Sequence, residues 1–310
     1  MKKRISVIIP VYNEVESLED LYQQLKSALE KFRPFEMIFI DDGSTDGSTE
    51  YLTSLCESES NVVLIQFHRN YGKSAALAEG FKLAEGDYIV TIDADLQDDP
   101  MEIPNLVTEL EKGFDLVSGW KKHRQDPWSK KIPSRIFNAV TRFFSGVKIH
   151  DFNCGLKVYR QSVVKTLDIY GGRHRYIPAL AGQKKFKVGE IVVNHRKRLH
   201  GYSKYGGARL FHGFFDLLSI IFLSRYLQSP LYLFGQIGTI TSLFGLVVEV
   251  YVLYLKYGLG DPFQKHMALL VFGVLMIVVG IQFFSIGLMG EMIAYSNQGK
   301  ENRIKSIKTS

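Results

Sequence analysis

Two hydrophobic patterns divide this chain of 310 residues. In residues 1–205, short β-branched runs alternate with stretches in which leucine and alanine recur at helical spacing. The runs that predict strands are ISVIIPVY, FEMIFID, NVVLIQF and DYIVTIDAD. Alternation of this kind predicts an α/β domain, with a parallel or mostly parallel sheet and helices on both of its faces.

The second pattern is almost continuously apolar. Residues 231–255 and 267–289 form two such runs with a polar loop between them, and as helices each exceeds the roughly 30 Å of a bilayer core. We therefore expect a hairpin of two membrane spans. A pair of buried core helices is the alternative, which the length and all-round apolarity disfavour. Lysine and arginine are more frequent in the segments before and after the hairpin than in the loop between its two runs. This imbalance predicts that the N-terminal domain and the tail are cytoplasmic.

Between the two patterns lies YGGARLFHGFFDLLSIIFLSRYLQSP, where dense apolar residues are interrupted by charged ones. This pattern predicts an amphipathic helix in the membrane surface, with a core helix of the N-terminal domain as the alternative. The predicted organisation is a cytoplasmic domain over 1–206, the amphipathic segment over 207–228, the hairpin over 229–291 and a basic tail over 292–310.

Composition narrows the class of protein only slightly. The formal net charge of +6 is no nucleic-acid signature by itself, and we expect no nucleic-acid partner. Two cysteines are too few for a disulfide framework, which suggests a reducing compartment. The first apolar run is short and interrupted, so we interpret it as a strand and not as a signal peptide. Glycines 235, 238 and 245 permit close helix packing, which allows a homo-oligomer through the hairpin.

Carboxylates gather where the predicted strands end. The fourth strand runs into Asp93, Asp95, Asp98 and Asp99, and the polar clusters YNE and DDGSTD follow two earlier strands. The carboxyl ends of parallel strands meet at one crevice. Two carboxylates at positions i and i+2 can bind one Mg²⁺ or Mn²⁺ ion, so one interpretation is a divalent metal site. The alternative interpretation is that these aspartates are solvated loop residues without a ligand. We expect the last two, just before Pro100, to be turn and helix-start residues.

Basic residues gather between positions 171 and 209, where Glu190 is the sole acid. The densest part is HRKRLHGYSKYGGAR. Anionic lipid attracts basic residues near a membrane, so a solvated or membrane-facing role is one interpretation. A basic rim beside a metal site also suits a phosphorylated donor and an anionic lipid acceptor.

Seven motifs in order carry a family resemblance: VIIPVYNE, FIDDGSTDGS, HRNYGKSAALAEG, TIDADLQDDP, DFNCGLKVYR, RYIPAL and HRKRLHGYSKYG. The chain resembles family 2 glycosyltransferases with a GT-A fold. Within that family it resembles the polyprenyl-phosphate glycosyltransferases that carry a C-terminal two-span hairpin. The resemblance implies transfer of a hexose from a nucleoside-diphosphate sugar to a polyprenyl phosphate, at the cytoplasmic face of a bacterial or archaeal plasma membrane.

The resemblance also implies roles for individual residues. The positions that match donor contacts are Pro10, Tyr12, Glu14, Ile40, Asp41, Asp42 and Ala94. The positions that match the metal-binding set, for Mg²⁺ or Mn²⁺, are Asp93, Asp95 and Gln97. Lys73, in contrast, is interpreted as a helix-start cation outside the site.

Further implied contacts are basic. Arg198 and Lys204 match the pair that grips the donor diphosphate. Lys121 stands where the mannose synthases of the family have an arginine. A lysine keeps the charge but lacks the bidentate fork of arginine, and Arg124 is the alternative residue for this contact.

The implied reaction places negative charge on the leaving β-phosphate. The metal and the fixed charges of Arg198 and Lys204 would stabilise that charge. A phosphate monoester, with a second pKa of about 6, is already an anionic nucleophile near neutral pH. Asp151 is the candidate base or acceptor-orienting group, with a structural capping acid as the alternative. The candidate catalytic set is Asp95, Arg198, Lys204 and Asp151. In-line attack on the donor would invert the anomeric centre.

Two other classes of protein compete with this interpretation. Processive polysaccharide synthases resemble the N-terminal half of this chain, but they carry a QxxRW motif. Neither Trp120 nor Trp128 follows Gln-x-x-Arg, which argues against this class. A non-catalytic membrane scaffold with a degenerate domain is the other alternative. The intact Asp93–Asp95 and Arg198–Lys204 pairs argue against it.

Overall fold

The fold is described from a computed structural model, in which residues 4–122, 128–167, 169, 173–196, 222, 226 and 229–297 are described. The chain divides into two compact units, residues 1–220 and 221–310. The predicted segment 207–228 lies almost wholly outside the described residues, so its amphipathic helix and the domain boundaries around it stay predictions.

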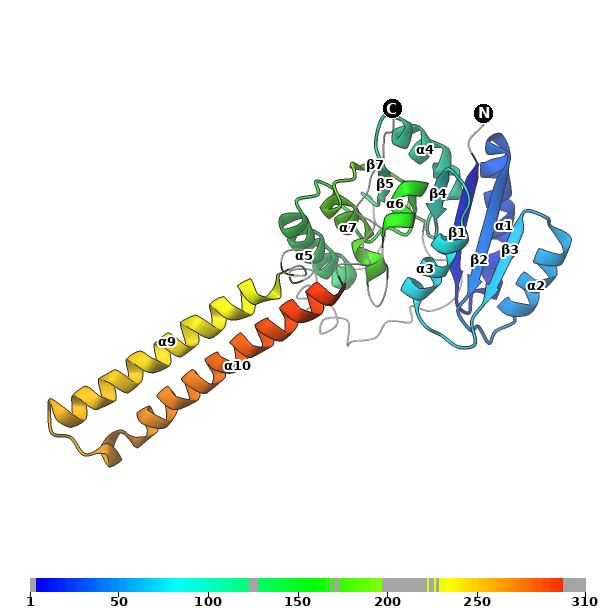
Figure 1. Ribbon diagram of the computed structural model, residues 1–310. Coiled ribbons are helices and arrows are strands. Elements are labelled where there is room, and N and C mark those ends of the chain that lie inside the picture. The colour runs from blue at the N-terminus through cyan, green and yellow to red at the C-terminus, as the bar shows by residue number, and fades with distance from the viewer. Residues whose placement is uncertain are drawn as a thin grey trace. The chain divides into compact units, whose positions relative to one another are not determined.

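Within the described residues, seven strands form one sheet in the order β3-β2-β1-β4-β6-β5-β7 (Figure 1). The strands are β1 (Ile5–Val11), β2 (Phe35–Asp41), β3 (Val62–Gln66), β4 (Tyr88–Thr91), β5 (Leu116–Trp120), β6 (Lys157–Arg160) and β7 (Val188–Val192). β6 runs antiparallel to β4 and β5, and the other neighbours are parallel. The predicted mostly parallel, mixed sheet is confirmed.

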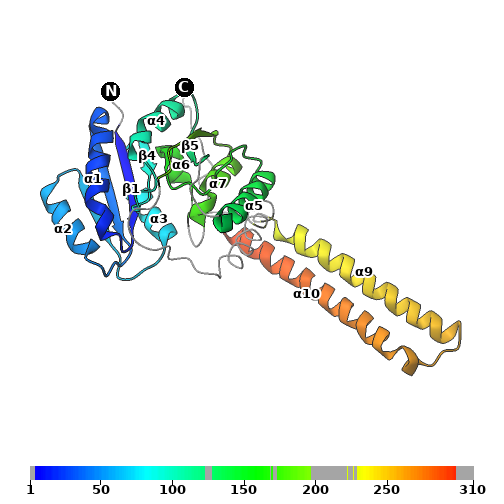
Figure 2. The same cartoon turned by 180° about the vertical axis from the view of Figure 1, so that it is seen from behind.

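Helices cover both faces of this sheet (Figure 2). They are α1 (Val15–Leu29), α2 (Ser48–Ser58), α3 (Lys73–Leu83), α4 (Ile103–Glu111), α5 (Trp128–Ser145), α6 (Gln161–Thr166) and α7 (Ile177–Gln183). Side chains alternate across a strand, so Val7 and Ile9 of β1 enter the core under α1 and α4. Ile8 between them enters the opposite core under α3 and α6.

The loops that follow β1 and β2 are fastened to each other by hydrogen bonds. The Asn13 N–H donates to Ser44 Oγ at 3.0 Å, and the Thr45 N–H donates to Asn13 Oδ1 at 2.8 Å. The Val15 N–H donates to Asp46 Oδ2 at 3.0 Å. These bonds satisfy backbone groups that the end of each strand leaves unpaired, and they hold both loops at one edge of the sheet.

The second unit is a helical hairpin of α9 (Pro230–Tyr257) and α10 (Met267–Asn297), joined through the short turn η4 (Phe263–His266). The two helices lie side by side in both views (Figures 1 and 2). Each is long and apolar enough to cross a membrane. A Cβ on Gly238 would lie 2.5 Å from the Gly280 carbonyl oxygen, and one on Gly245 would lie 2.7 Å from that of Gly273. Close backbone approach therefore holds the pair together.

Gly43, in the loop that follows β2, offers a test of how tightly the strand-end loops are fixed. Its φ is +72°, and a Cβ there would lie 2.6 Å from the backbone carbonyl carbon of Arg69. Gly43→Ala should lower the thermal midpoint of the detergent-solubilised protein by more than Gly113→Ala. The control glycine also has a left-handed φ, of +107°, but nothing within 4 Å. Left-handed strain alone costs about 1–2 kcal/mol, and the backbone clash adds to it at Gly43. Equal losses would contradict the close approach.

Candidate active site

Three oxygen-bearing side chains follow β4 in alternate positions. Asp93, Asp95 and Gln97 are partly exposed, whereas Ala94 and Leu96 between them are buried. The Gln97 N–H donates to Asp95 Oδ1 at 3.2 Å, which ties these two residues into one turn. The alternation presents the three side chains away from the core, and their role as metal ligands stays a prediction.

This donor set suits a hard divalent cation. Two carboxylates and an amide oxygen are ligands that Mg²⁺ accepts, and substrate phosphate oxygens commonly complete its shell. Among the described residues, no group of three or more His, Cys, Asp or Glu side chains is placed to hold a metal. The set from Asp93 to Gln97 therefore fits a metal that arrives with an anionic substrate better than a metal held by protein alone.

Asp93 is the most constrained of the three. β6 lies antiparallel beside β4, and this register places Gly155 opposite Asp93, where a Cβ would lie 2.6 Å from the Asp93 carboxyl carbon. Lys73 Nζ, at the first residue of α3, forms an ion pair with Asp93 Oδ1. Burial opposes ionisation, but the charges of Lys73, Lys121 and Lys157 outweigh it and lower the pKa of Asp93 to about 2. Lys73 is thus more than a helix-start cation.

Asp98 and Lys121 form a buried ion pair. Lys121 Nζ lies 2.7 Å from Asp98 Oδ1, with the two side chains 9% and 0% exposed. Burial lowers the pKa of Lys121, but Asp98 outweighs it and the net shift is upward, so the lysine is charged. Asp98, expected to be a turn residue, instead forms a β-bridge with His195 and is fully buried. Asp99 fits its predicted role, because its Oδ1 accepts the Met101 N–H at 3.0 Å at the start of a short helix.

The donor positions at the end of β2 are engaged in the protein itself. Asp41 accepts the Ser44 N–H at 2.9 Å and the Thr49 hydroxyl. Asp42 accepts the Tyr71 and Gly72 N–H groups at 2.7 and 2.9 Å. Burial raises the pKa of Asp42, and these two donors partly offset the effect.

The remaining donor positions lie along the same edge of the sheet. The side chain of Ile40 is fully buried in the core, which leaves only its backbone to a ligand. Pro10 is the penultimate residue of β1, Tyr12 is 36% exposed just beyond, and the Glu14 N–H donates to Ser48 Oγ at 3.2 Å. Ala94 is buried, and its carbonyl accepts the Ser17 hydroxyl at 2.7 Å. Their donor contacts stay predictions.

The start of the basic segment is fastened to the metal-facing set. Residues 98 and 195 form an antiparallel bridge, and the Arg196 N–H donates to the Gln97 carbonyl at 2.9 Å. The Arg196 guanidinium also lies 2.6 Å from Asp99 Oδ2. Arg198 and Lys204 follow soon after in the sequence, and both lie outside the described residues.

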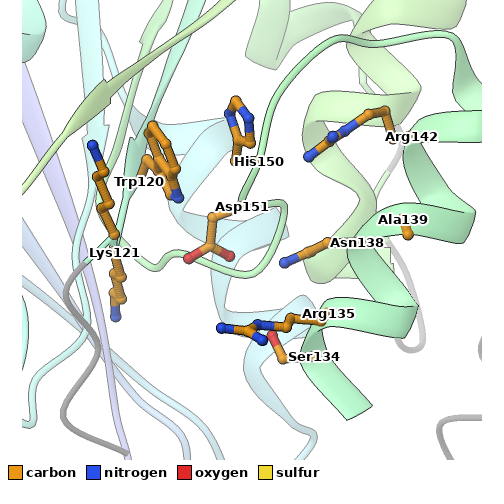
Figure 3. Close-up of a pocket in the computed structure, with 10 residues that line it drawn as sticks. Trp120, Lys121, Ser134, Arg135, Asn138, Ala139, Arg142, His150 and Asp151 are labelled. Atoms are coloured by element: carbon orange, nitrogen blue, oxygen red, sulfur yellow. The ribbon is translucent and has the colours of Figure 1, made fainter. Parts of the chain in front are cut away.

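Asp151 lines a pocket of about 590 Å³ between β5 and α5. The pocket-lining residues are Trp120, Lys121, Lys122, Ser134, Arg135, Asn138, Ala139, Arg142, His150 and Asp151. The Asp151 carboxylate points between Lys121 and the α5 side chains Arg135 and Asn138 (Figure 3). It also accepts the Asn153 N–H at 3.0 Å, so it serves its own turn as well.

Sequence reasoning missed the α5 side of this pocket. Arg135, Asn138 and Arg142 stand at helical spacing, and that periodicity was the available signal. On the strand side, the Trp120 and His150 rings stack with centroids 4.1 Å apart, and His150 pairs with Glu190. The pocket is therefore walled by cations and by a flat aromatic surface.

His174 fixes the start of α3. Its Nδ1 lies 2.8 Å from Ser74 Oγ, and its backbone N–H donates to the same oxygen at 3.1 Å. Because that oxygen accepts the backbone N–H, its hydroxyl proton is available to the ring. Burial, followed by the charges of Lys73 and Arg175, lowers the pKa of His174 to about 3. The ring is therefore neutral at physiological pH.

A substitution in the buried pair of Lys121 and Asp98 tests whether Lys121 has a structural role. Lys121→Met leaves Asp98 buried without its cation, so the protein should lose about 3–5 kcal/mol of stability and show a clearly lower thermal midpoint. The double variant Lys121→Met with Asp98→Asn should recover much of the loss. An unchanged midpoint together with weaker donor binding would instead assign Lys121 to the donor.

The His174 pKa predicts an acid-sensitive contact. Below pH 6.5 the unfolded chain binds a proton on His174 that the folded chain excludes until about pH 3, so stability falls as the pH falls through this window. Between about pH 7.5 and about pH 5 the wild type should lose roughly 1–2 kcal/mol more than His174→Asn. The asparagine Oδ1 still accepts from Ser74. Thermal midpoints across the pH series measure the difference, and parallel curves would refute it.

Comparison with known proteins places these features in a family. The Glycosyl transferase family 2 domain matches residues 6–168. Dodecaprenyl-phosphate galacturonate synthase of Rhizobium johnstonii is 36% identical over 94% of this chain and 87% of its own length. Undecaprenyl-phosphate 4-deoxy-4-formamido-L-arabinose transferase of Pseudomonas aeruginosa is 38% identical over 93% and 84%.

A solved structure shares the fold. Glucosyl-3-phosphoglycerate synthase of Mycobacterium tuberculosis, in complex with Mn²⁺ and UDP-glucose, superposes with a TM-score of 0.56 at 18% sequence identity, over 72% of this chain and 79% of that one. The family match spans more than half of this sequence, and the two curated relatives span nearly all of it. The chain belongs to glycosyl transferase family 2.

Proposed function

We propose that this chain transfers a sugar, predicted to be a hexose, from a nucleoside diphosphate to a polyprenyl phosphate. The observation that carries the proposal is the set Asp93, Asp95 and Gln97, which faces outward from the end of β4 next to a cation-walled pocket. The two relatives act, by name, on dodecaprenyl and undecaprenyl phosphate. α9 and α10 suit an enzyme whose acceptor resides in a bilayer.

The donor would bind at the ends of β1, β2 and β4. Asp95 and Gln97, with Asp93 beside them, would hold Mg²⁺ or Mn²⁺, which supplies Lewis-acid stabilisation of the departing diphosphate. A structural neighbour crystallised with Mn²⁺ and UDP-glucose, and another with Mg²⁺ and UDP, support divalent metal use by this fold. Arg198 and Lys204, which lie outside the described residues, would add positive charge to stabilise the departing diphosphate.

The acceptor phosphate would enter the pocket between β5 and α5. Lys122, Arg135 and Arg142 line it, and together they favour a dianion. The phosphate oxygen is already ionised near neutral pH, so no base is required to activate it. Asp151 would then orient the acceptor and would repel a phosphate that entered too deeply. This assigns Asp151 a positioning role, beside its hydrogen bond to the Asn153 N–H.

The membrane arrangement follows from charge. Lysine and arginine dominate the flanks on one side of the hairpin, which supports a cytoplasmic catalytic domain in a bacterial or archaeal plasma membrane. The donor is a nucleotide sugar, which is a cytoplasmic metabolite, so the donor and the catalytic domain would share a compartment. Self-association through the hairpin stays a prediction.

Product formation is the direct test. The purified full-length protein, with Mn²⁺, undecaprenyl phosphate and a panel of UDP- and GDP-sugars, should form a glycosylated polyprenyl phosphate detectable by mass spectrometry. Asp95→Ala should lower the rate by about a hundredfold or more, because it removes stabilisation of the leaving diphosphate. Removal of the metal with EDTA should abolish turnover, and added Mn²⁺ should restore it.

A matched control keeps this test specific. Asp115→Asn removes a carboxylate that caps the Lys187 N–H at the far end of β5, and it should leave product formation intact. If no donor yields product and Asp95→Ala behaves as the wild type does in donor binding, the scaffold interpretation gains and the enzymatic one fails.

A further inference from the structure

Lys73 occupies the carboxylate that a metal would need. Its Nζ pairs with Asp93 Oδ1, and the two side chains are 30% and 33% exposed. The opposite side of the Asp93 carboxylate packs against Gly155. A cation that approaches Asp93 from the open side therefore meets the ammonium of Lys73 first. The inference drawn from this contact rests on the proposed metal-dependent function.

The backbone on both sides of Lys73 is held in place. Asp42 accepts the Tyr71 and Gly72 N–H groups immediately before it. His174 grips the Ser74 hydroxyl immediately after it. These contacts fix the Lys73 Cα and leave its four-carbon side chain as the part that moves. Two segments far apart in sequence, 71–74 and 173–176, thus serve to aim one ammonium group at Asp93.

An ammonium and a divalent cation cannot share Asp93 without cost. Like charges a few ångströms apart repel, and a partly desolvated site screens them less than bulk water does. In the metal-free protein Lys73 neutralises Asp93, so a bare metal ion must either displace the ammonium or bind beside it. An incoming donor diphosphate changes this balance, because it offers Lys73 another anion within the same site.

We propose that Lys73 competes with the metal for Asp93 until the donor diphosphate draws its ammonium away. The metal and the nucleotide then bind with positive coupling: each raises the affinity for the other by the same factor. Asp93 alternates between two cations, while Asp95 and Gln97 serve the metal throughout. Lys73 is in this sense a positioning residue that makes metal loading depend on the donor.

Metal binding without nucleotide tests the competition directly. Mn²⁺ is titrated into the full-length protein in detergent, and free Mn²⁺ is read from its electron paramagnetic resonance signal. Lys73→Met removes the charge at nearly constant length and should lower the Kd for Mn²⁺ by about fivefold. Lys73→Arg keeps the charge and should bind Mn²⁺ as the wild type does. Lys26→Met, which breaks a 2.7 Å pair with Glu59 away from the site, is the matched control.

Nucleotide supplies the second arm. With UDP or GDP, whichever binds, the wild type should gain Mn²⁺ affinity, and the gain in Lys73→Met should be smaller by the same fivefold factor, because only direct coordination by the phosphates remains. An unchanged Kd in Lys73→Met without nucleotide overturns the proposal. The Asp95→Ala variant distinguishes failure of the competition from failure of the metal assignment. If Asp95→Ala abolishes Mn²⁺ binding while Lys73→Met has no effect, only the competition fails. If neither the wild type nor Lys73→Met binds Mn²⁺ with or without nucleotide, the competition and the metal assignment fail together.

Discussion

Negative charge at the end of β4 is the constraint around which this domain is arranged. Four aspartates follow the strand within seven residues, and three of them pair with cations from other parts of the chain. Lys73 pairs with Asp93, Lys121 with Asp98 and Arg196 with Asp99, whereas Asp95 accepts the Gln97 N–H. Burying such a cluster is costly without these partners, so the surrounding elements must lie where the charges require.

The antiparallel strand β6 has a particular part in this arrangement. It separates β4 from β5 and places Gly155 against Asp93, where any side chain would displace the carboxylate. The same chain segment carries Asp151 into the pocket beside α5. One short stretch before β6 therefore connects the metal-facing set to the proposed acceptor pocket. A fully parallel sheet would have placed this stretch at the opposite edge.

Local patterns predict most of the framework and only part of the site. The β-branched runs ending at Asp41 and Thr91 and the long apolar runs are strong signals, and the structure confirms the sheet and the two long apolar helices. The partner of Asp98 was not predictable, because Lys121 reaches it through tertiary packing that no local pattern records. The contact of Lys73 with Asp93 was not predictable for the same reason. The helix-start position explains this lysine locally, and its contact with Asp93 arises only when α3 packs on β1 and β2, next to which β4 lies.

The glycines of the hairpin have a consequence for its geometry. Gly238 meets Gly280, and Gly245, seven residues later, meets Gly273, seven residues earlier. A seven-residue repeat is the spacing of a left-handed supercoil, because it keeps one seam of each helix facing the other. Sliding one helix past the other by a turn would bring side chains where backbone now meets backbone. The hairpin therefore has one favoured register, in which Pro230 at the start of α9 lies against Gly290 and α10 continues beyond it to Asn297.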